Sequence, residues 1–311
     1  MKLQWNQSGR HCTFPCRRPP GSILLRYYLL FSYFTAVPAC LFPSCTRLPG
    51  DLTEDVSVKV DSTWFTIAMD ASCNISDSLP AMNRLDIFLY GADGLKDLEH
   101  YETMNRFPDT LRIRAASRIM TAVAIVNSPR SVNRAAIERY DSIELLCYEF
   151  DEDSPDAPVM SGICTLEPGR DGTLTVTPLM SRVVLTEISN TMKGYVRLED
   201  PRIYLENMSA SAEVLRAEGF RPTEMREGYI TAKLPFDIGI FKQNPCTALY
   251  CYPNDSPEPT VGSPETTMVL ECEISGTTRR FSVKLPTLKR NSTQHVEITV
   301  NGPESFESKV Y

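Results

Sequence analysis

Histidine is scarce in this sequence, with 3 residues among 311. Metal centres and acid–base catalysis commonly rely on histidine, and the sequence holds no H-E-x-x-H, G-x-S-x-G or P-loop motif. His11 lies in the N-terminal segment, His100 in a polar connection without a second histidine at ligand spacing, and His295 on the strand face opposite Val296. We therefore predict no catalytic residue, no metal site and no cofactor, while two carboxylates on distant strands would still permit a glycosidase.

Long uninterrupted apolar runs are also missing. The most apolar stretch, residues 27–45 (YYLLFSYFTAVPACLFPSC), is broken by polar residues and by Pro38 and Pro43. It falls short of the roughly 18 apolar residues that a membrane-spanning helix needs. Five basic residues and no acidic residue occur in residues 1–45, and small residues with a cysteine close the segment. This order predicts a secretory signal over residues 1–45.

Two cysteines close segments that resemble lipoboxes, the motif in which the cysteine of a bacterial lipoprotein is acylated: residues 37–40 (VPAC) and 42–45 (FPSC). We favour Cys45 as the lipidated residue, with Cys40 as the alternative, because polar residues 46–55 follow Cys45 directly and would form a tether. Each buried methylene of an acyl chain contributes about 0.8 kcal/mol to membrane binding. A cleaved signal with two incidental cysteines is the competing interpretation.

Clusters of basic residues are lacking as well. Beyond residue 45 the chain holds 27 Lys and Arg against 39 Asp and Glu, a net charge of −12, which disfavours nucleic acid and anionic lipid as partners. Six cysteines remain there, but a chain of this length can build a core without disulfides. Cys246 and Cys251 have no second close pair, which disfavours a four-cysteine zinc site.

Helical periodicity is weak, and alternation of apolar and polar residues dominates. Residues 131–140 (SVNRAAIERY), with Ser131 as the cap, are the only helix that we predict. Many short alternating strands with turn residues between them predict an all-β double sandwich. The predicted strands are residues 56–60, 84–90, 111–114, 119–126, 143–150, 159–166, 173–177, 179–188, 202–208, 229–234, 247–252, 267–274, 279–285 and 294–300.

Pro178 stands between two of these strands. Proline is poorly tolerated inside a central strand, so we predict that the chain leaves one sheet and enters another there. The predicted domains are residues 56–177 and 178–302, followed by a tail over residues 303–311.

Several passages together resemble the fimbrillin-like lipoproteins of the Bacteroidales, which include subunits and anchors of type V pili. The resemblance covers about residues 45–302 as an ordered series of weak motifs. It implies two transthyretin-like β-sandwich domains in tandem, displayed at the outer membrane. The passages are the lipobox-like start, VSVKVDSTWFTIAM, RLDIFLYGADG, MTAVAIVN, GTLTVTPLMSRVVL and LKRNSTQHVEITVNG.

Stalk subunits of that family assemble by strand addition. Each loses its first strand after an arginine and receives the C-terminal strand of a neighbour, a form of β-augmentation. In this sequence Arg47 lies too close to Cys45 for such a cut to remove a strand, and Lys59 lies inside the first predicted strand. Residues 301–311 (NGPESFESKVY) make a poor donor strand because of Gly302 and the polar residues around it. The chain therefore fits an anchor, a tip or a stand-alone surface protein better.

Tyr250 and Tyr252 precede a proline-rich loop, residues 253–264 (PNDSPEPTVGSP). We predict this aromatic strand end as a surface contact for sugar or a partner subunit, with a rigid loop packed on its own domain as the alternative.

Two short patterns add weaker candidates. Asp151, Asp153 and Asp156 are spaced like a calcium loop, but Pro155 occupies a ligand position, so a solvated acidic turn is favoured. A motif of Asp, Ser or Thr, then an apolar residue or Thr resembles the O-glycosylation motif of the Bacteroidales. It marks Ser62, Ser78, Thr110 and Ser142.

Together these patterns predict a non-enzymatic, surface-exposed outer-membrane lipoprotein that acts as a fimbrial anchor, tip or accessory subunit through β-strand pairing. Its expected partners are the outer membrane, through the N-terminal lipid, and fimbrial subunits, but no nucleic acid. A stand-alone carbohydrate-binding surface lipoprotein is the alternative, and a secreted hydrolase is a third possibility.

Overall fold

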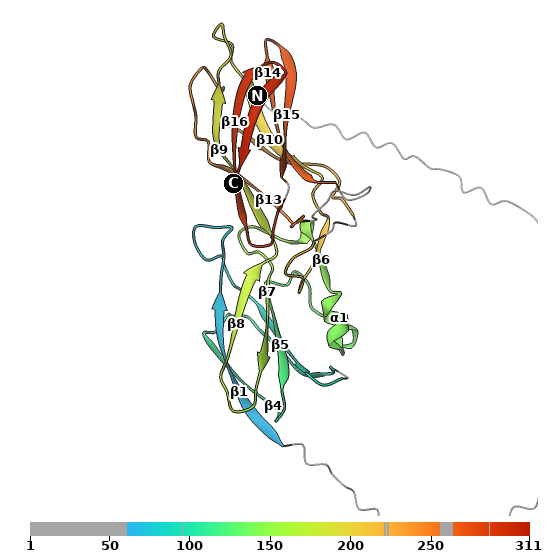
Figure 1. Ribbon diagram of the computed structural model, residues 1–311. Coiled ribbons are helices and arrows are strands. Elements are labelled where there is room, and N and C mark those ends of the chain that lie inside the picture. Colours follow the sequence, from blue (N-terminus) through green and yellow to red (C-terminus); the bar gives the residue numbers. More distant parts are fainter. Residues whose placement is uncertain (1–60, 95, 221, 223, 256–263, 286) are drawn as a thin grey trace, which may run out of the picture. The chain divides into compact units, whose positions relative to one another are not determined.

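The structure is a computed structural model that describes residues 61–94, 96–220, 222, 224–255, 264–285 and 287–311 (Figure 1). Strands dominate the described residues, and the helices are single turns. The all-β fold predicted from the alternation is thus confirmed. The predicted signal, the tether and the strand over residues 56–60 lie outside the described residues.

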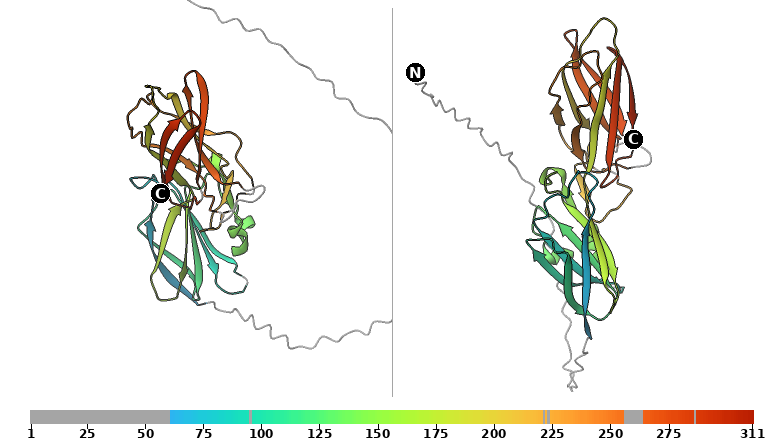
Figure 2. Two further views of the ribbon diagram at one scale, coloured as in Figure 1. Left: turned by 45° about the horizontal axis from the view of Figure 1, so that its top comes forward. Right: turned by 90° about the vertical axis from the view of Figure 1, so that its left-hand side faces the viewer.

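A seven-stranded sheet has the order β3-β2-β5-β7-β8-β1-β4. β7 and β8 share only the pairs Met160 with Pro178 and Ser161 with Thr177, and the sheet halves on either side of this junction enclose one core cluster. We call this unit the first sandwich. β1 runs parallel to β8 and antiparallel to β4 (Figure 2). The strands of the first sandwich are β1 (Ser62–Ala71), β2 (Leu85–Gly91), β3 (Leu98–Met104), β4 (Thr110–Ala116), β5 (Met120–Val126), β7 (Met160–Leu166) and β8 (Gly172–Pro178).

Strand β2 departs from the expectation of one buried face. The face with Leu85, Ile87 and Leu89 packs into the core of the first sandwich. The other face, with Phe88 and Tyr90, is also buried, in a second cluster to which the segment after β5 contributes. Alternation did not predict this second buried face, because the segments that cover it are irregular connections without a periodic pattern of apolar residues.

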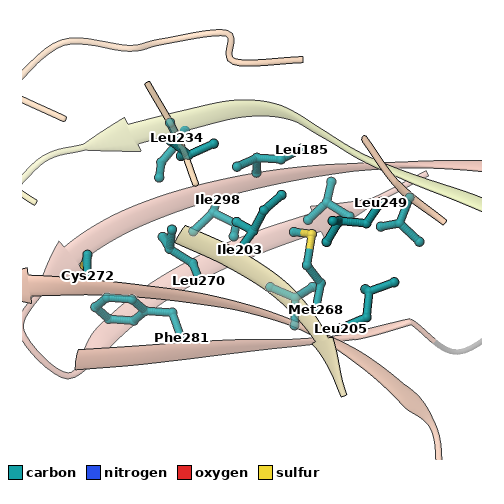
Figure 3. Close-up of a cluster of buried hydrophobic side chains, with 14 of the residues drawn as sticks. Leu185, Ile203, Leu205, Leu234, Leu249, Met268, Leu270, Cys272, Phe281 and Ile298 are labelled. Atoms are coloured by element: carbon teal, nitrogen blue, oxygen red, sulfur yellow. The ribbon is translucent and has the colours of Figure 1, made fainter. Parts of the chain in front are cut away.

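Two four-stranded sheets, with the orders β12-β10-β14-β15 and β13-β9-β16-β17, form the second sandwich. Leu185 and Ile298 from one sheet and Ile203, Leu270 and Phe281 from the other meet in its core (Figure 3). β16 runs parallel to β9, as β8 does to β1. The strands of the second sandwich are β9 (Ser181–Asn190), β10 (Glu199–Glu206), β12 (Ile230–Lys233), β13 (Thr247–Cys251), β14 (Thr266–Ile274), β15 (Thr277–Leu285), β16 (Thr293–Gly302) and β17 (Ser305–Val310). The division of the chain into two domains at Pro178 stays a prediction.

The connection from β5 to β7 holds short elements: η1 (Arg134–Ile137), α1 (Tyr140–Glu144), β6 (Cys147–Glu149) and η2 (Phe150–Glu152). The helix predicted over residues 131–140 is therefore shorter, and the strand predicted over residues 143–150 is wrong in its first half. Ile143 is buried whereas Leu145 is 79% exposed, because a helical turn separates side chains that a strand would place on one face. β6 pairs with β11 (Ser211–Glu213).

Arg290, in the connection from β15 to β16, ties several segments together. Its Nε donates to the carbonyl of Pro178, and its terminal nitrogens donate to Ser161 and Thr177 and to carbonyls of the segment after β11. These bonds engage both terminal nitrogens and Nε, and no carboxylate is among the acceptors. Burial lowers the pKa of Arg290 to about 10. The residue is therefore a structural clamp rather than a free anion-binding group.

Candidate functional site

The C-terminal strand β17 continues the sheet of β9 and β16. It pairs antiparallel with β16 from Gly302 opposite Ser305 to Val296 opposite Val310, and Phe306 packs against Phe281 with ring centroids 5.5 Å apart. Residues 303–311, which we expected to form a tail, therefore include a strand. The expectation failed because an edge strand needs apolar side chains on only one face, and Phe306 and Val310 supply them here.

Tyr311, directly after β17, adds contacts between this strand and β16. Its backbone exchanges two hydrogen bonds with His295, with N–O distances of 2.8 and 3.1 Å. The two rings stack with centroids 5.6 Å apart, and the Tyr311 hydroxyl donates to Glu297 Oε1 at 3.0 Å. Among the described residues no strand pairs with the outer edge of β17. That edge therefore presents backbone N–H and C=O groups of the kind that an added strand uses.

Two loops at one end of the second sandwich form a second candidate surface. The turn between β9 and β10 and the segment between β12 and β13 line an open cavity of about 530 Å³. Tyr195 and Phe241 line it and are 83% and 72% exposed. Arg197 also lines it and has no hydrogen-bond or ion-pair partner among the described residues. The remaining lining residues are Asp237, Gly239 and Ile240.

None of these residues stands out in the sequence as a candidate site. Their signal is the occurrence of aromatic residues inside glycine-containing turns, in KGYVR and FDIGIF. The alternating pattern of strands carries no information about such turns.

Tyr252, predicted as a surface contact, is buried. Its hydroxyl lies 3.1 Å from Asp153 Oδ2, and its ring meets Phe150 edge-on with centroids 5.2 Å apart. Desolvation raises the pKa of its hydroxyl. Tyr250 is half-buried and packs against the same cluster. The prediction for Tyr252 is wrong because the end of β13 packs against the connection after α1, a long-range contact that no local pattern reveals.

The acidic turn after β6 is more ordered than the expected solvated turn. Asp153 Oδ1 accepts hydrogen bonds from the backbone N–H groups of Ser154 and Val159, both at 2.8 Å, and desolvation raises the pKa of Asp153 to about 6. Asp151 instead pairs with Arg226 Nε at 2.7 Å. No cluster of metal-ligating residues occurs among the residues that the structure describes.

The histidines and cysteines have structural surroundings. His100 lies on the edge strand β3 rather than in a connection, with its Nε2 3.5 Å from Glu102. All six described cysteines are free thiols. Burial raises the pKa of Cys251 and of Cys272 to about 12, which makes these two thiols poor nucleophiles.

The predicted modification sites are only partly described. Cys45 and Cys40 lie outside the described residues. Of the predicted glycosylation sites, Ser62, Ser78 and Thr110 are exposed, whereas Ser142 is half-buried in α1. In the described part, no helix has the length and apolar character needed to span a membrane.

The sequence matches no family model and no curated protein, but the structure resembles solved proteins. A candidate cell adhesion protein from Bacteroides eggerthii DSM 20697 superposes with a TM-score of 0.59 at 13% identity, over 81% of this chain and 95% of that chain. Fimbrilin from Porphyromonas gingivalis W83 gives a TM-score of 0.56 at 11% identity, over 79% and 92%.

The tip fimbrial protein Mfa3 from Porphyromonas gingivalis, truncated at its C-terminus, gives a TM-score of 0.53 at 10% identity, over 81% of this chain and 99% of that chain. Identities this low show the fold alone. The chain therefore has the all-β fold that is found in fimbrillin-like and candidate cell adhesion proteins of these bacteria.

Proposed function

We propose that this protein is a fimbrillin-like, surface-exposed accessory subunit of fimbriae, acting as an anchor or a tip. The resemblance of the sequence motifs and the likeness of the fold to fimbrilin and to a tip fimbrial protein support this role. A lipid on Cys45, or on Cys40 as the alternative, would hold the chain at the outer membrane. Glycans on Ser62, Ser78, Thr110 and Ser142 are part of the same proposal.

One observation carries the choice of an accessory role over a stalk role. The C-terminal strand β17 is paired within its own sheet and is closed by the Tyr311–His295 bridge. A strand used in this way is not available for donation to a neighbour unless it detaches from β16. Its free outer edge can instead accept a strand from a fimbrial subunit.

The lipid anchor and the fibre association are tested together. The N-terminal peptide of the native protein is identified by mass spectrometry, and the protein is followed in membrane fractions and in sheared surface fibres. We expect an acylated Cys45 and recovery with both fractions. Cys45→Ser should release the protein from the membrane, whereas Cys40→Ser should leave it anchored. An unlipidated protein without fibre association would contradict the proposal, and an N-terminus cut beyond Val60 in fibres would indicate a stalk subunit.

The strand-pairing step needs its own test. Ser308→Pro removes a backbone N–H of the outer edge of β17, because Tyr311 exchanges its backbone bonds with His295 and the pairing alternates along the strand. Ser308→Ala is the matched control because it retains that N–H. We expect fewer fibres, or detached fibres, with the proline variant only. Since proline could also detach β17, thermal unfolding of both purified variants must show a folded chain. Equal fibre attachment for two folded variants would argue against pairing through this strand.

A stand-alone carbohydrate-binding surface lipoprotein is the second candidate, and the cavity beside Tyr195 and Phe241 favours it. This function predicts glycan affinity and no fibre defect after deletion of the gene. The fimbrial function predicts lost or detached fibres.

A further inference from the structure

Exposed aromatic side chains in the second sandwich border two hollows. Tyr195 and Ile240 line the cavity of about 530 Å³ shared with Phe241, and the same two residues line a second hollow of about 350 Å³ with Asn190 and Gly194. We propose that this surface, the Tyr195–Phe241 surface, binds a saccharide. Two hollows separated by one pair of side chains suit a chain of sugar units better than a single small ligand.

The loops that carry this surface are held by the strands beneath them. Leu198 and Ile238 exchange two backbone hydrogen bonds at 2.9 Å, and so do Ile188 and Gln243. The segment that bears Phe241 is thus fixed on both sides of the aromatic residue. A site held in this way loses little conformational entropy when it binds a ligand.

A buried amide organises the opposite loop. Asn190 is 2% exposed, and its Nδ2 donates to the carbonyl of Val196 at 2.8 Å. Its Oδ1 accepts a hydrogen bond from the backbone N–H of Met192 at 3.0 Å. Between these contacts Tyr195 has a φ of 58°, a left-handed conformation that is unfavourable for a residue other than glycine. The fold therefore holds Tyr195 outward at a cost in stability.

The chemistry of the lining groups matches a sugar. Aromatic faces carry negative partial charge and pack against C–H groups, which one face of a pyranose ring provides. Arg197, which has no partner among the described residues, can donate a pair of hydrogen bonds to adjacent hydroxyls. Asp237 accepts one backbone N–H, from Asp200 at 3.0 Å through Oδ1, so its second carboxylate oxygen can accept a hydroxyl.

A polypeptide strand fits this surface less well. Strand addition requires a free row of backbone groups, whereas the backbone of Ile188, Leu198, Ile238 and Gln243 is already paired in the bridges beneath the loops. The cavity offers mainly side chains. The exposed groups therefore favour a ligand that presents C–H faces and hydroxyls.

This inference deepens the carbohydrate-binding candidate and goes beyond the fimbrial role. It is tested on the full chain, purified from membranes in detergent, by electrophoresis through gels that contain mannan, xylan, hyaluronan or mucin. We expect retardation by at least one polymer. Because the assay contains no fibres, its failure leaves the fimbrial function standing, and a failure of the fibre experiments leaves this assay unaffected.

Variants then locate the binding surface. Tyr195→Ala and Phe241→Ala should each weaken binding at least about tenfold, and Arg197→Gln should weaken it without changing the melting temperature. Trp64→Ala, which removes an aromatic side chain that is 55% exposed on the first sandwich, is the matched control and should bind normally. Absence of retardation by every polymer overturns the proposal, as does equal weakening by Trp64→Ala. Self-association that Phe241→Ala abolishes, without any retardation, would overturn it in favour of a protein contact.

Discussion

The guanidinium Nη2 of Arg290 lies 2.6 Å from the carbonyl oxygen of Thr177, at the end of β8. The same nitrogen reaches the carbonyl of Ser161 at 2.9 Å, so one side chain bridges β8 and β7 where only two residue pairs join these strands. A charged donor strengthens such bonds relative to neutral ones. Arg290 thus reinforces the junction between β7 and β8.

Arg290→Ala should lower the free energy of unfolding by at least about 3 kcal/mol. The variant loses several charge-assisted hydrogen bonds and leaves the carbonyl groups that accepted them without a donor. Arg290→Lys should be intermediate, since an ammonium lacks the planar fork of donors. Urea denaturation measures both. Arg170→Ala, in an exposed pair with Glu167, should change stability by less than about 0.5 kcal/mol, and a similarly small effect of Arg290→Ala would refute the clamp.

The carboxyl of Asp153 makes stability fall as pH rises. Its pKa is about 6 in the folded chain against an ordinary 3.8, so the folded state binds the extra proton between these values. Stability should therefore decrease from pH 3.8 to 6 by about 3 kcal/mol from this group. Asp153→Asn should remove this contribution to the pH dependence, so that the stability difference between the variant and the native chain changes between pH 3.8 and 6, and the variant should be the more stable form at pH 8. Denaturation curves recorded across this pH range measure the stability of both chains. Asp156→Asn is the control for the loss of one surface charge. A stability difference between Asp153→Asn and the native chain that does not change with pH would exclude Asp153 as the source of the pH dependence.

The buried carboxylate of Asp86 depends on Arg84. Asp86 is 0% exposed and accepts bonds from Arg84 Nε at 2.9 Å and Thr103 Oγ1 at 2.6 Å. Arg84→Met should cost about 3–5 kcal/mol, because it leaves a buried charge without its cation. Adding Asp86→Asn should recover at least about 1 kcal/mol in a double-mutant cycle. Arg112→Met, which loses only a contact with the Trp64 ring, is the control; no recovery in the double variant would mean that the charge is not the cause.

Gly162 is required by the close approach of β7 to β8. A Cβ there would overlap the carbonyl oxygen of Thr175 and approach Leu174 Cδ2 to 3.0 Å. Gly162→Ala should therefore destabilise the chain by about 2 kcal/mol or more. Gly94→Ala, where nothing lies within 4 Å, should remain within about 0.5 kcal/mol of the native chain. Matching melting temperatures for the two variants would show that β7 and β8 can separate without loss.

Period-two alternation determined most of the strands, because each inner position of a sandwich must leave water while its neighbours remain hydrated. Phe281, Val283 and Leu285 in β15, and Val296, Ile298 and Val300 in β16, follow this rule and are all buried. The all-β class and the absence of long helices follow from the same pattern.

Tertiary structure decided what covers each element and which side chains stay exposed. Tyr252 and the second face of β2 are buried by segments distant in sequence, and residues 303–311 became a strand because β16 offered an edge. Tyr195 and Phe241 meet at one cavity because two unrelated turns end at the same side of a sandwich. Local sequence patterns record which side chains avoid water, but burial by remote segments and the meeting of loops depend on the path of the whole chain.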